Sequence, residues 1–408
     1  MRILIFTQHY VPEVTAARVR LEAFAEGLVE GGHEVEVVCG VPNHPEGVVR
    51  PEFKGKATVR RTVNGVKVHY VWVRASPRKT AVNRVLLYGS YAATATVVGS
   101  SLRRPDVVLA SSPPLPVAAA GALVAARHRV PWVFDVRDLW PEAAIILGEL
   151  RDGRVARLAE RLERRLYRSA AAIVTVTQPF QSDISRHIQD PGKISVVTNG
   201  TTRTWLDIGA SEVDRGALSL PEDRFVWAYA GNLGIAQGLE AAVDAAGLLG
   251  DEYQLLLLGD GPVRESLEQR AQNLDHGAVA FHGLVEPVMA ARYLRAADAL
   301  LVPLDAQPAL GKFVPSKLFD YCAVGRPVIV AAAGESQRLV AEGGAGMAVP
   351  PADAEALAAA VRRLRDDPAL GASLAEAGRA FASQHLRERQ VAQLEGILSR
   401  VQPRRALR

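Results

Sequence analysis

Two charged side chains, Lys317 and Asp320, are spaced so that they could act together on one ligand. Residues three apart share one face of a helix, and the surrounding sequence predicts a helix here. Pro315 suits a first helical turn, Ser316 is a candidate N-cap, and Gly325 marks the end. A cation and a carboxylate at a helix start could bind an anion and a hydroxylated ring. The same spacing is typical of a surface ion pair, so both interpretations stay open.

The rest of this segment predicts the core that positions the helix. An apolar stripe at helical spacing consists of Leu318, Phe319, Cys322 and Ala323. Residues 328–331 then form a short apolar run, typical of a strand buried in a parallel sheet. The charged pair is therefore expected at the start of a helix that packs on a sheet.

A glycine-rich loop from Gly231 to Gly238 follows a predicted strand at residues 225–231 and opens a helix. Glycines at such a turn let backbone N–H groups approach a phosphate. The candidate contacts in this loop are Gly231, Asn232, Gly234 and Gln237. A plain β–α turn has the same pattern, so the loop alone does not establish a phosphate site.

The N-terminal half has a candidate rim of its own. A strand at residues 2–6, a helix and a second strand at 33–39 predict a βαβ unit. Ligands bind beyond the carboxyl ends of such strands. The candidate substrate contacts on this rim are His9, Glu13, Ala16 and His44. His44, in the loop at 41–47, could equally be a solvated loop residue.

Strand–helix alternation continues through the chain and predicts an α/β fold with two doubly wound domains. Further strands are predicted at residues 106–112, 132–136, 172–176, 194–197, 254–259, 279–283 and 299–303, with a hairpin around Asn64-Gly65. We assign the domains to residues 1–200 and 223–384, a linker to 201–222, and a C-terminal helix and tail to 385–408.

The composition excludes several other classes of protein. In 408 residues, 49% are hydrophobic and 23% charged, which is typical of a soluble globular chain. Cys39 and Cys322 lie in apolar runs and predict buried small hydrophobes, with no disulfide or metal site. The chain opens on a strand without a signal-peptide layout, so a cytoplasmic location is expected. Residues 85–102 carry no charge, but their hydroxyl residues and glycines favour a helix that does not span a membrane.

Residues 151–168 predict a helix with seven arginines and three acidic residues, at a net charge of +4. Its predicted apolar stripe is Val155, Leu158, Leu162 and Leu166. Together with the uncharged stretch and a basic tail at 400–408, this favours peripheral docking on an anionic membrane. Alternatively, the stripe packs on the sheet and the arginines are solvated. Because basic and aromatic residues are not interleaved, no nucleic acid partner is expected.

The segment from Lys312 to Val330 resembles the nucleotide-sugar signature of retaining glycosyltransferases of family 4. In that signature one Glu opens the motif and a second follows after seven residues; here Lys312 and Asp320 stand at these positions. The run Pro-Ser-Lys-Leu-Phe-Asp-Tyr-Cys is similar to the branch that builds surface polysaccharides from N-acetylated amino sugars. The resemblance extends along nearly the whole chain. It implies a GT-B fold, with two Rossmann-like domains facing each other across a cleft and a final helix returning to the first domain.

The resemblance also implies roles for the donor-site residues. Family members often have an Arg and a Lys in the glycine-rich loop, where Asn232 and Gln237 stand here. The charge of a diphosphate must then be compensated elsewhere, with Lys317 the first choice and Lys312 the second. Asp320 is expected to accept hydrogen bonds from ribose hydroxyls. Further donor contacts are expected at Gly259, Gly283, Leu284, Val285, Ser316 and Leu318, with the backbone from Gly283 to Val285 reading the base.

In the N-terminal domain, Arg137 stands where many relatives have a His that contacts the donor sugar. Asp138 follows and could orient the acceptor hydroxyl. The catalytic candidates are thus Asp138, Arg137 and Lys317, although a structural Arg–Asp pair at the rim is the alternative for the first two.

The reaction that the resemblance implies is transfer of a sugar, with retention, from a nucleotide diphosphate sugar to a hydroxyl of a glycan or lipid-linked acceptor. UDP is the expected nucleotide, and an N-acetylated amino sugar or deoxy sugar the expected group. We expect no metal and no cofactor besides the nucleotide sugar as co-substrate. Two alternatives are a sugar-nucleotide 2-epimerase of the same fold, using Glu13 and Asp138, and a nucleotide-sugar-binding protein without turnover.

Overall fold

The structure is a computed structural model that describes residues 1–13, 15–78, 80–142, 145, 153–274 and 277–402. The chain divides into two compact units. The first comprises Met1–Thr198 together with the chain from Arg387, and the second comprises Asn199–Leu386. Each is described below by itself.

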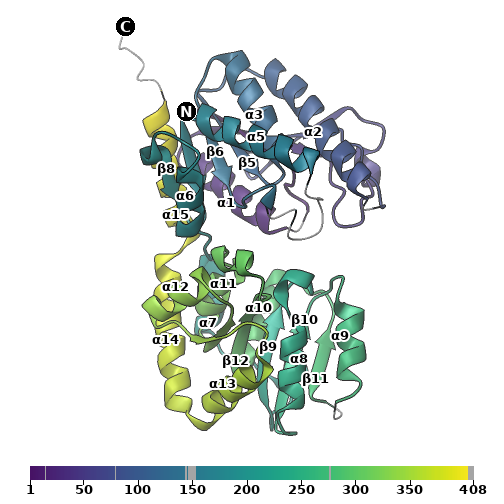
Figure 1. The fold of residues 1–408 in the computed structure, drawn as a ribbon, viewed down its shortest axis with the longest axis vertical. Coiled ribbons are helices and arrows are strands. Elements are labelled where there is room, and N and C mark those ends of the chain that lie inside the picture. The colour runs from purple at the N-terminus through teal and green to yellow at the C-terminus, as the bar shows by residue number, and fades with distance from the viewer. Residues whose placement is uncertain (14, 79, 143–144, 146–152, 275–276, 403–408) are drawn as a thin grey trace. The chain divides into compact units, whose positions relative to one another are not determined.

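The N-terminal unit contains an eight-stranded sheet in the order β3-β4-β2-β1-β5-β6-β7-β8 (Figure 1). All strand pairs are parallel except β3 with β4, which form the predicted hairpin around Asn64 and Gly65, both at positive φ. The strands are β1 (Arg2–Thr7), β2 (Glu34–Gly40), β3 (Thr58–Val63), β4 (Val66–Val71), β5 (Val107–Ser112), β6 (Trp132–Val136), β7 (Ala172–Thr175) and β8 (Ile194–Val196). The main helices are α1 (Ala16–Glu30), α2 (Ala81–Ser101), α3 (Leu115–His128), α5 (Arg154–Ser169), α6 (Gln178–Ser185) and α15 (Arg387–Val401).

The last helix, α15, packs against α1 of this unit (Figure 1). A Cβ added to Gly27 of α1 would lie 2.8 Å from Val391 of α15, so the small residue permits the close helix contact. His33 and Glu395 add a 2.9 Å hydrogen bond beside it. The apolar side of α15 is therefore part of the N-terminal core, with Leu394, Ile397 and Leu398 buried.

The C-terminal unit contains a six-stranded, fully parallel sheet in the order β11-β10-β9-β12-β13-β14. Its strands are β9 (Phe225–Ala230), β10 (Tyr253–Leu258), β11 (Val279–His282), β12 (Ala299–Pro303), β13 (Val328–Ala331) and β14 (Met347–Val349). Its helices are α7 (Arg203–Ala210), α8 (Glu240–Gly247), α9 (Arg264–Ala271), α10 (Pro287–Ala296), α11 (Lys317–Val324), α12 (Glu335–Gly343), α13 (Ala354–Asp366) and α14 (Pro368–Gln384). Both unit folds match the alternation predicted from the sequence, apart from the three-residue β14, which was not predicted.

Residues 201–222 differ from the linker expected there. They contain α7, whose Trp205 and Leu206 pack against the core of the C-terminal unit. Arg215 donates a 2.5 Å hydrogen bond to Asp298, at the start of β12. This segment is therefore part of the second unit rather than a free connection.

The arginine-rich helix also differs from the prediction. Its described part, α5, buries Ala156, Ala159, Leu166 and Tyr167. Val155 and Leu158 are instead 59% and 66% exposed, so the predicted stripe is wrong for these two residues. Arg151 and residues 403–408 of the basic tail lie outside the described residues.

Residues 85–102 form most of α2, as predicted. Among the described helices, none has the length and apolarity to cross a bilayer.

Candidate functional site

Helix α11 places Lys317 and Asp320 in its first turn. Its predicted apolar stripe is fully buried, and Gly325 ends the helix in the left-handed region at φ 73°. Two details differ from the predictions. Ser316 has helical backbone angles and makes no capping hydrogen bond, so it is not a side-chain cap. Leu318 is completely buried in the core, which leaves its side chain unable to contact a ligand.

The ammonium group of Lys317 is held by Tyr229 of β9. Lys317 Nζ donates a 2.5 Å hydrogen bond to Tyr229 Oη and lies 3.8 Å from the centroid of that ring. Burial lowers the pKa of Lys317 to about 7, and the nearby charge of Asp320 only partly opposes this shift. Lys317 is therefore poised to gain a proton when an anion binds beside it.

Two tyrosines fix the end of β9, from which the glycine-rich loop departs. The Tyr229 hydroxyl donates to the carbonyl of Asn232 at 2.7 Å. The Tyr321 hydroxyl donates to the carbonyl of Ala230 and accepts from its N–H, at 2.8 and 2.7 Å. Neither tyrosine was identified from the sequence, where each is one aromatic residue in an apolar run.

Close backbone packing explains two glycines of this rim. Gly231 has φ 143°, and a Cβ added there would lie 2.6 Å from Lys317 Nζ. A Cβ on Gly259 would lie 2.0 Å from the carbonyl oxygen of Gly231. The loop differs from the expected direct helix start, because a 3-10 turn at Ile235–Gln237 precedes α8. The side-chain oxygen of Gln237 is buried there without a hydrogen-bond partner among the described residues.

The strand end at Gly283 joins the same rim. The N–H of Gly259 donates to the carbonyls of His282 and Gly283, at 2.9 and 3.2 Å. His282 also forms a 2.9 Å hydrogen bond with the Tyr293 hydroxyl, which ties the end of β11 to α10. Leu284 is 78% exposed, whereas Val285 packs against the core. Lys312 ends a 3-10 turn at Pro308–Lys312 and, like Asp320, is half-buried.

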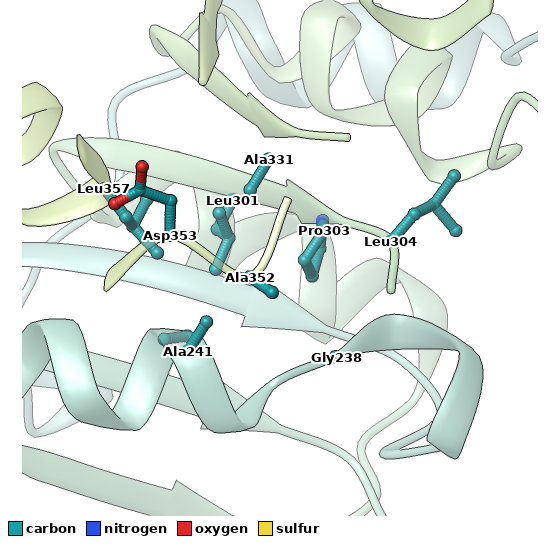
Figure 2. Close-up of a pocket in the computed structure, with 10 residues that line it drawn as sticks. Gly238, Ala241, Leu301, Pro303, Leu304, Ala331, Ala352, Asp353 and Leu357 are labelled. Atoms are coloured by element: carbon teal, nitrogen blue, oxygen red, sulfur yellow. The ribbon is translucent and has the colours of Figure 1, made fainter. Parts of the chain in front are cut away.

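A small cavity lies next to Gly238, at the other end of the glycine-rich loop. Figure 2 shows Ala241 of α8 and Leu301 and Pro303 of β12 around it. Its volume is about 10 Å³, which is roughly the space for a single water molecule. This cavity cannot hold a nucleotide.

In the N-terminal unit, Glu13 holds the predicted rim together. The carboxylate is 2% exposed and lies 2.6 Å from His9 Nδ1. Its other oxygen accepts from the backbone N–H groups of Asn43 and His44, at 2.6 and 2.8 Å. Burial raises the pKa of Glu13, but the hydrogen bonds and the charge of His9 outweigh it, so the net pKa is lowered. The rings of His9 and His44 are 5.2 Å apart, so the structure brings these three predicted residues together. Ala16 begins α1 nearby in sequence.

Arg137 is engaged by groups at the ends of β5 and β6. Its Nε donates to Ser111 Oγ at 2.8 Å, and a terminal nitrogen donates to the Pro113 carbonyl at 3.3 Å. Its Nε also lies 3.8 Å from a carboxylate oxygen of Asp135. The rim therefore contains a structural pair of Arg137 with the fully buried Asp135, and the charge of Asp138 acts on Arg137 as well.

Asp138 follows β6 and is half-buried. Its charge acts on Tyr167 of α5, whose hydroxyl donates a 2.6 Å hydrogen bond to Glu163. Burial raises the pKa of Glu163 to about 7.

Comparison with known families decides the class of this protein. Residues 15–200 match the family described as glycosyl transferase 4-like domain, and residues 224–367 match glycosyl transferases group 1. The chain belongs to family 4 of the glycosyltransferases. This glycosyltransferase uses a nucleotide sugar, and the matches do not favour the 2-epimerase alternative.

Relatives of this family 4 glycosyltransferase include proteins named for surface polysaccharides. It is 26% identical to WcaI of Escherichia coli (strain K12), named for colanic acid biosynthesis, over 89% of this chain and 92% of WcaI. It is 27% identical to WbjE of Pseudomonas aeruginosa over 64% of this chain and 66% of WbjE.

Solved structures show the fold. Sucrose-phosphate synthase from Thermosynechococcus elongatus has a TM-score of 0.74 at 20% identity, covering 98% of both chains. Anabaena HepE, in complex with UDP and glucose, has a TM-score of 0.73 at 18% identity, covering 98% of this chain and 99% of HepE. The two parallel-sheet, Rossmann-like units are those of a GT-B glycosyltransferase, as predicted.

Among the described residues, no three His, Cys, Asp or Glu side chains are placed to hold a metal ion. The expected independence of metals and cofactors stays a prediction.

Proposed function

We propose that this glycosyltransferase transfers a sugar, with retention, from a UDP-sugar to a hydroxyl of a glycan or lipid-linked acceptor. The observation that carries the donor assignment is the Lys317–Tyr229 contact beside Gly231, with Asp320 in the same helical turn as Lys317. HepE, solved with UDP and glucose, supports a UDP donor. The alpha-D-kanosaminyltransferase of Streptomyces kanamyceticus, 25% identical over 54% of this chain, supports an amino sugar as the group transferred.

In this proposal, Lys317 stabilises the charge that develops on the leaving diphosphate. A preorganised cation in a site of low polarity is effective because it needs no reorganisation during the reaction. The backbone N–H groups of the loop at Gly231 add hydrogen bonds to the phosphates, while Asp320 accepts from the ribose hydroxyls. The leaving diphosphate then takes the proton of the acceptor hydroxyl on the same face of the sugar, and the protein contributes positioning and charge stabilisation.

The N-terminal unit is proposed to bind the acceptor. Glu13 fixes His9 and the loop of His44, so these two imidazoles are held in a defined arrangement that could position a hydroxyl. Asp138 is proposed to orient the acceptor hydroxyl. Arg137 is proposed to contact the donor, using guanidinium donors beyond those bonded to Ser111 and Pro113.

Substitution of Asp320 by alanine tests the donor site. Loss of charged hydrogen bonds to the ribose should weaken UDP binding by about 1–3 kcal/mol. Calorimetric titration of UDP measures this effect, and Asp320→Asn should retain part of the affinity. Asp251→Ala, which removes an exposed carboxylate of the same unit, is the matched control and should bind UDP as the wild type does. Unchanged UDP affinity in Asp320→Ala would contradict the assignment.

We further propose that the enzyme docks on an anionic membrane surface through α2, α3 and α5. These helices contact one another in series and lie together in Figure 1. Large apolar side chains are exposed on all three: Val82, Val85, Val97, Leu123, Val155 and Leu158. The described part of α5 adds six arginines against Glu160 and Glu163, which leaves a charge of +4. Exposed apolar residues next to cations fit the boundary between lipid headgroups and acyl chains.

Sedimentation with vesicles tests this docking. The enzyme should pellet with vesicles that contain phosphatidylglycerol, and less so as salt rises, because the charge attraction is screened. The variant Arg157→Glu/Arg161→Glu should lose most of this binding. A control on another helix, Arg389→Glu, should not. Equal recovery of the wild type in the supernatant with anionic and neutral vesicles, at every salt concentration, would refute the proposal.

A further inference from the structure

One face of the N-terminal sheet carries charged side chains where a doubly wound fold normally buries apolar ones. In-register neighbours on parallel strands, and residues two apart on one strand, point to the same face. Arg2 is paired with Glu34, Glu36 with Lys67, and His69 with Arg60. These six residues therefore share one face of β1, β2, β4 and β3.

This charged face forms a groove of about 630 Å³. Leu102 and Arg103, directly after α2, complete its lining. The groove volume is within the range of small-molecule sites. The groove lies at the amino end of β2. Gly40, at the other end of this strand, reaches the rim of Glu13 and His44, which is about 20 Å from the groove along the strand.

The carboxylates of the groove already have partners. Glu34 accepts from Lys67 Nζ at 2.7 Å and from Arg2 Nε at 3.0 Å. These hydrogen bonds lower the pKa of Glu34 to about 2, so it is ionised and committed to that pair of cations. Glu36 is 2.8 Å from His69 Nε2.

Other cations of the groove have no such partner. Arg60 and Arg103 are exposed, and neither forms a hydrogen bond or ion pair within the described part of the chain. His69 is 5% exposed, and its Nδ1 is buried without a hydrogen-bond partner among the described residues. The cations Arg2, Arg60, Lys67 and Arg103 stand against the two carboxylates, which leaves a charge of +2. Arg61 also borders the groove, but its guanidinium lies over the Phe53 ring, 4.8 Å from the centroid.

We propose that this groove is a second anion-binding site, separate from the donor site, for a small oxyanion with several negative charges, such as a diphosphate or a sugar phosphate. Arg60 and Arg103 supply planar guanidinium groups that match phosphate oxygens in pairs. Arg2 and Lys67 contribute further charge from the floor of the groove while Glu34 holds them in place. The concave shape and the charge of +2 favour a compact ligand over the flat surface of a bilayer.

Calorimetric titration of inorganic pyrophosphate tests the site. Lys317→Ala serves as the background, because that change is intended to remove binding at the donor site. In this background one pyrophosphate site should remain, and adding Arg60→Ala/Arg103→Ala should weaken it at least tenfold. Arg127→Ala/Arg389→Ala, which removes two exposed arginines elsewhere in the unit, should leave it unchanged. If Lys317→Ala alone still binds two pyrophosphates, the donor assignment fails. Loss of one of these two sites in the triple variant Lys317→Ala/Arg60→Ala/Arg103→Ala would still support the groove.

Two outcomes would overturn the proposal. One is that pyrophosphate affinity and stoichiometry are the same with and without Arg60 and Arg103. The other is that their removal lowers recovery with phosphatidylglycerol vesicles but leaves pyrophosphate binding unaltered, since the groove would then be part of a lipid-binding surface. Because both arginines are exposed, the variants should unfold at the wild-type temperature, which checks that the fold is intact.

Discussion

Replacing Lys317 with alanine should lower kcat/KM for sugar transfer by about 10²–10³-fold, the range found when one preorganised donor to a developing charge is removed. The glycine-rich loop lacks a cation at Asn232 and Gln237, so Lys317 is the cation that the structure places against Gly231. Initial rates of UDP release from a UDP-sugar, with acceptor present, measure the effect. The thermal unfolding temperature should change little, because the side chain is only half-buried.

Two companion variants make this result specific. Tyr229→Phe removes the hydrogen bond to Lys317 Nζ but keeps the aromatic ring under it, so it should cost much less activity. Lys312→Ala tests the second-choice cation. If Lys312→Ala loses the activity and Lys317→Ala keeps it, the phosphate cation is Lys312.

The lowered pKa of Lys317 predicts a pH dependence of donor binding. A bound diphosphate favours the ammonium form and raises this pKa above its unliganded value of about 7. Below pH 7 the group is already charged, so binding takes up little additional proton. Above pH 7 binding must protonate the amine, and UDP-sugar affinity should fall by up to about tenfold per pH unit until the bound-state pKa is reached. Lys317→Ala should lack this pH dependence, and an equal slope in both proteins would contradict the assignment.

Replacing Asp135 with alanine should destabilise the N-terminal unit by about 3–5 kcal/mol, the range for breaking a buried ion pair on one side. Asp135 is fully buried and lies 3.3 Å from the guanidinium of Arg20, which is itself 2% exposed. The change would leave Arg20 with the Val197 and Thr198 carbonyls as its hydrogen-bond acceptors among the described residues.

Urea unfolding measures this effect. Asp135→Asn keeps the size of the side chain and its bond from Ser111, so its loss should be smaller. A double replacement, Arg20→Met/Asp135→Leu, should recover part of the stability, because it removes both charges of this pair while Arg137 still loses its contact with Asp135. A loss below about 1 kcal/mol in Asp135→Ala would show that the pair contributes little.

Local patterns were sufficient for most of the fold. The α11 segment illustrates this: its apolar spacing, Gly325 and the following apolar run all have near-neighbour causes, so the helix, its end and β13 could be predicted. The place of Lys317 and Asp320 in its first turn could be predicted for the same reason. What Lys317 touches could not, because Tyr229 is 88 residues away and their contact depends on β9 and α11 being packed together.

Other errors came from a choice among equivalent patterns. In α5, arginines surround several possible apolar stripes, so the sequence pattern did not select one. The stripe that faces the core contains Ala156, Ala159 and Tyr167, whereas Val155 and Leu158 are exposed. The partner of Arg137 shows a missed local signal. Residues two apart on a strand share a face, so the alternation indicated Asp135 as a structural partner of Arg137.

The return of α15 to the first unit has a consequence for the order of synthesis. The second unit, Asn199–Leu386, is complete before α15 is translated, and its two ends are joined by a hydrogen bond from the Thr201 N–H to the His385 carbonyl. The first unit begins earlier on the ribosome, yet its core lacks Leu394, Ile397 and Leu398 until the last helix has emerged. The half of the enzyme that is made first is therefore the half that finishes folding last, which reverses the usual N-to-C order of domain folding.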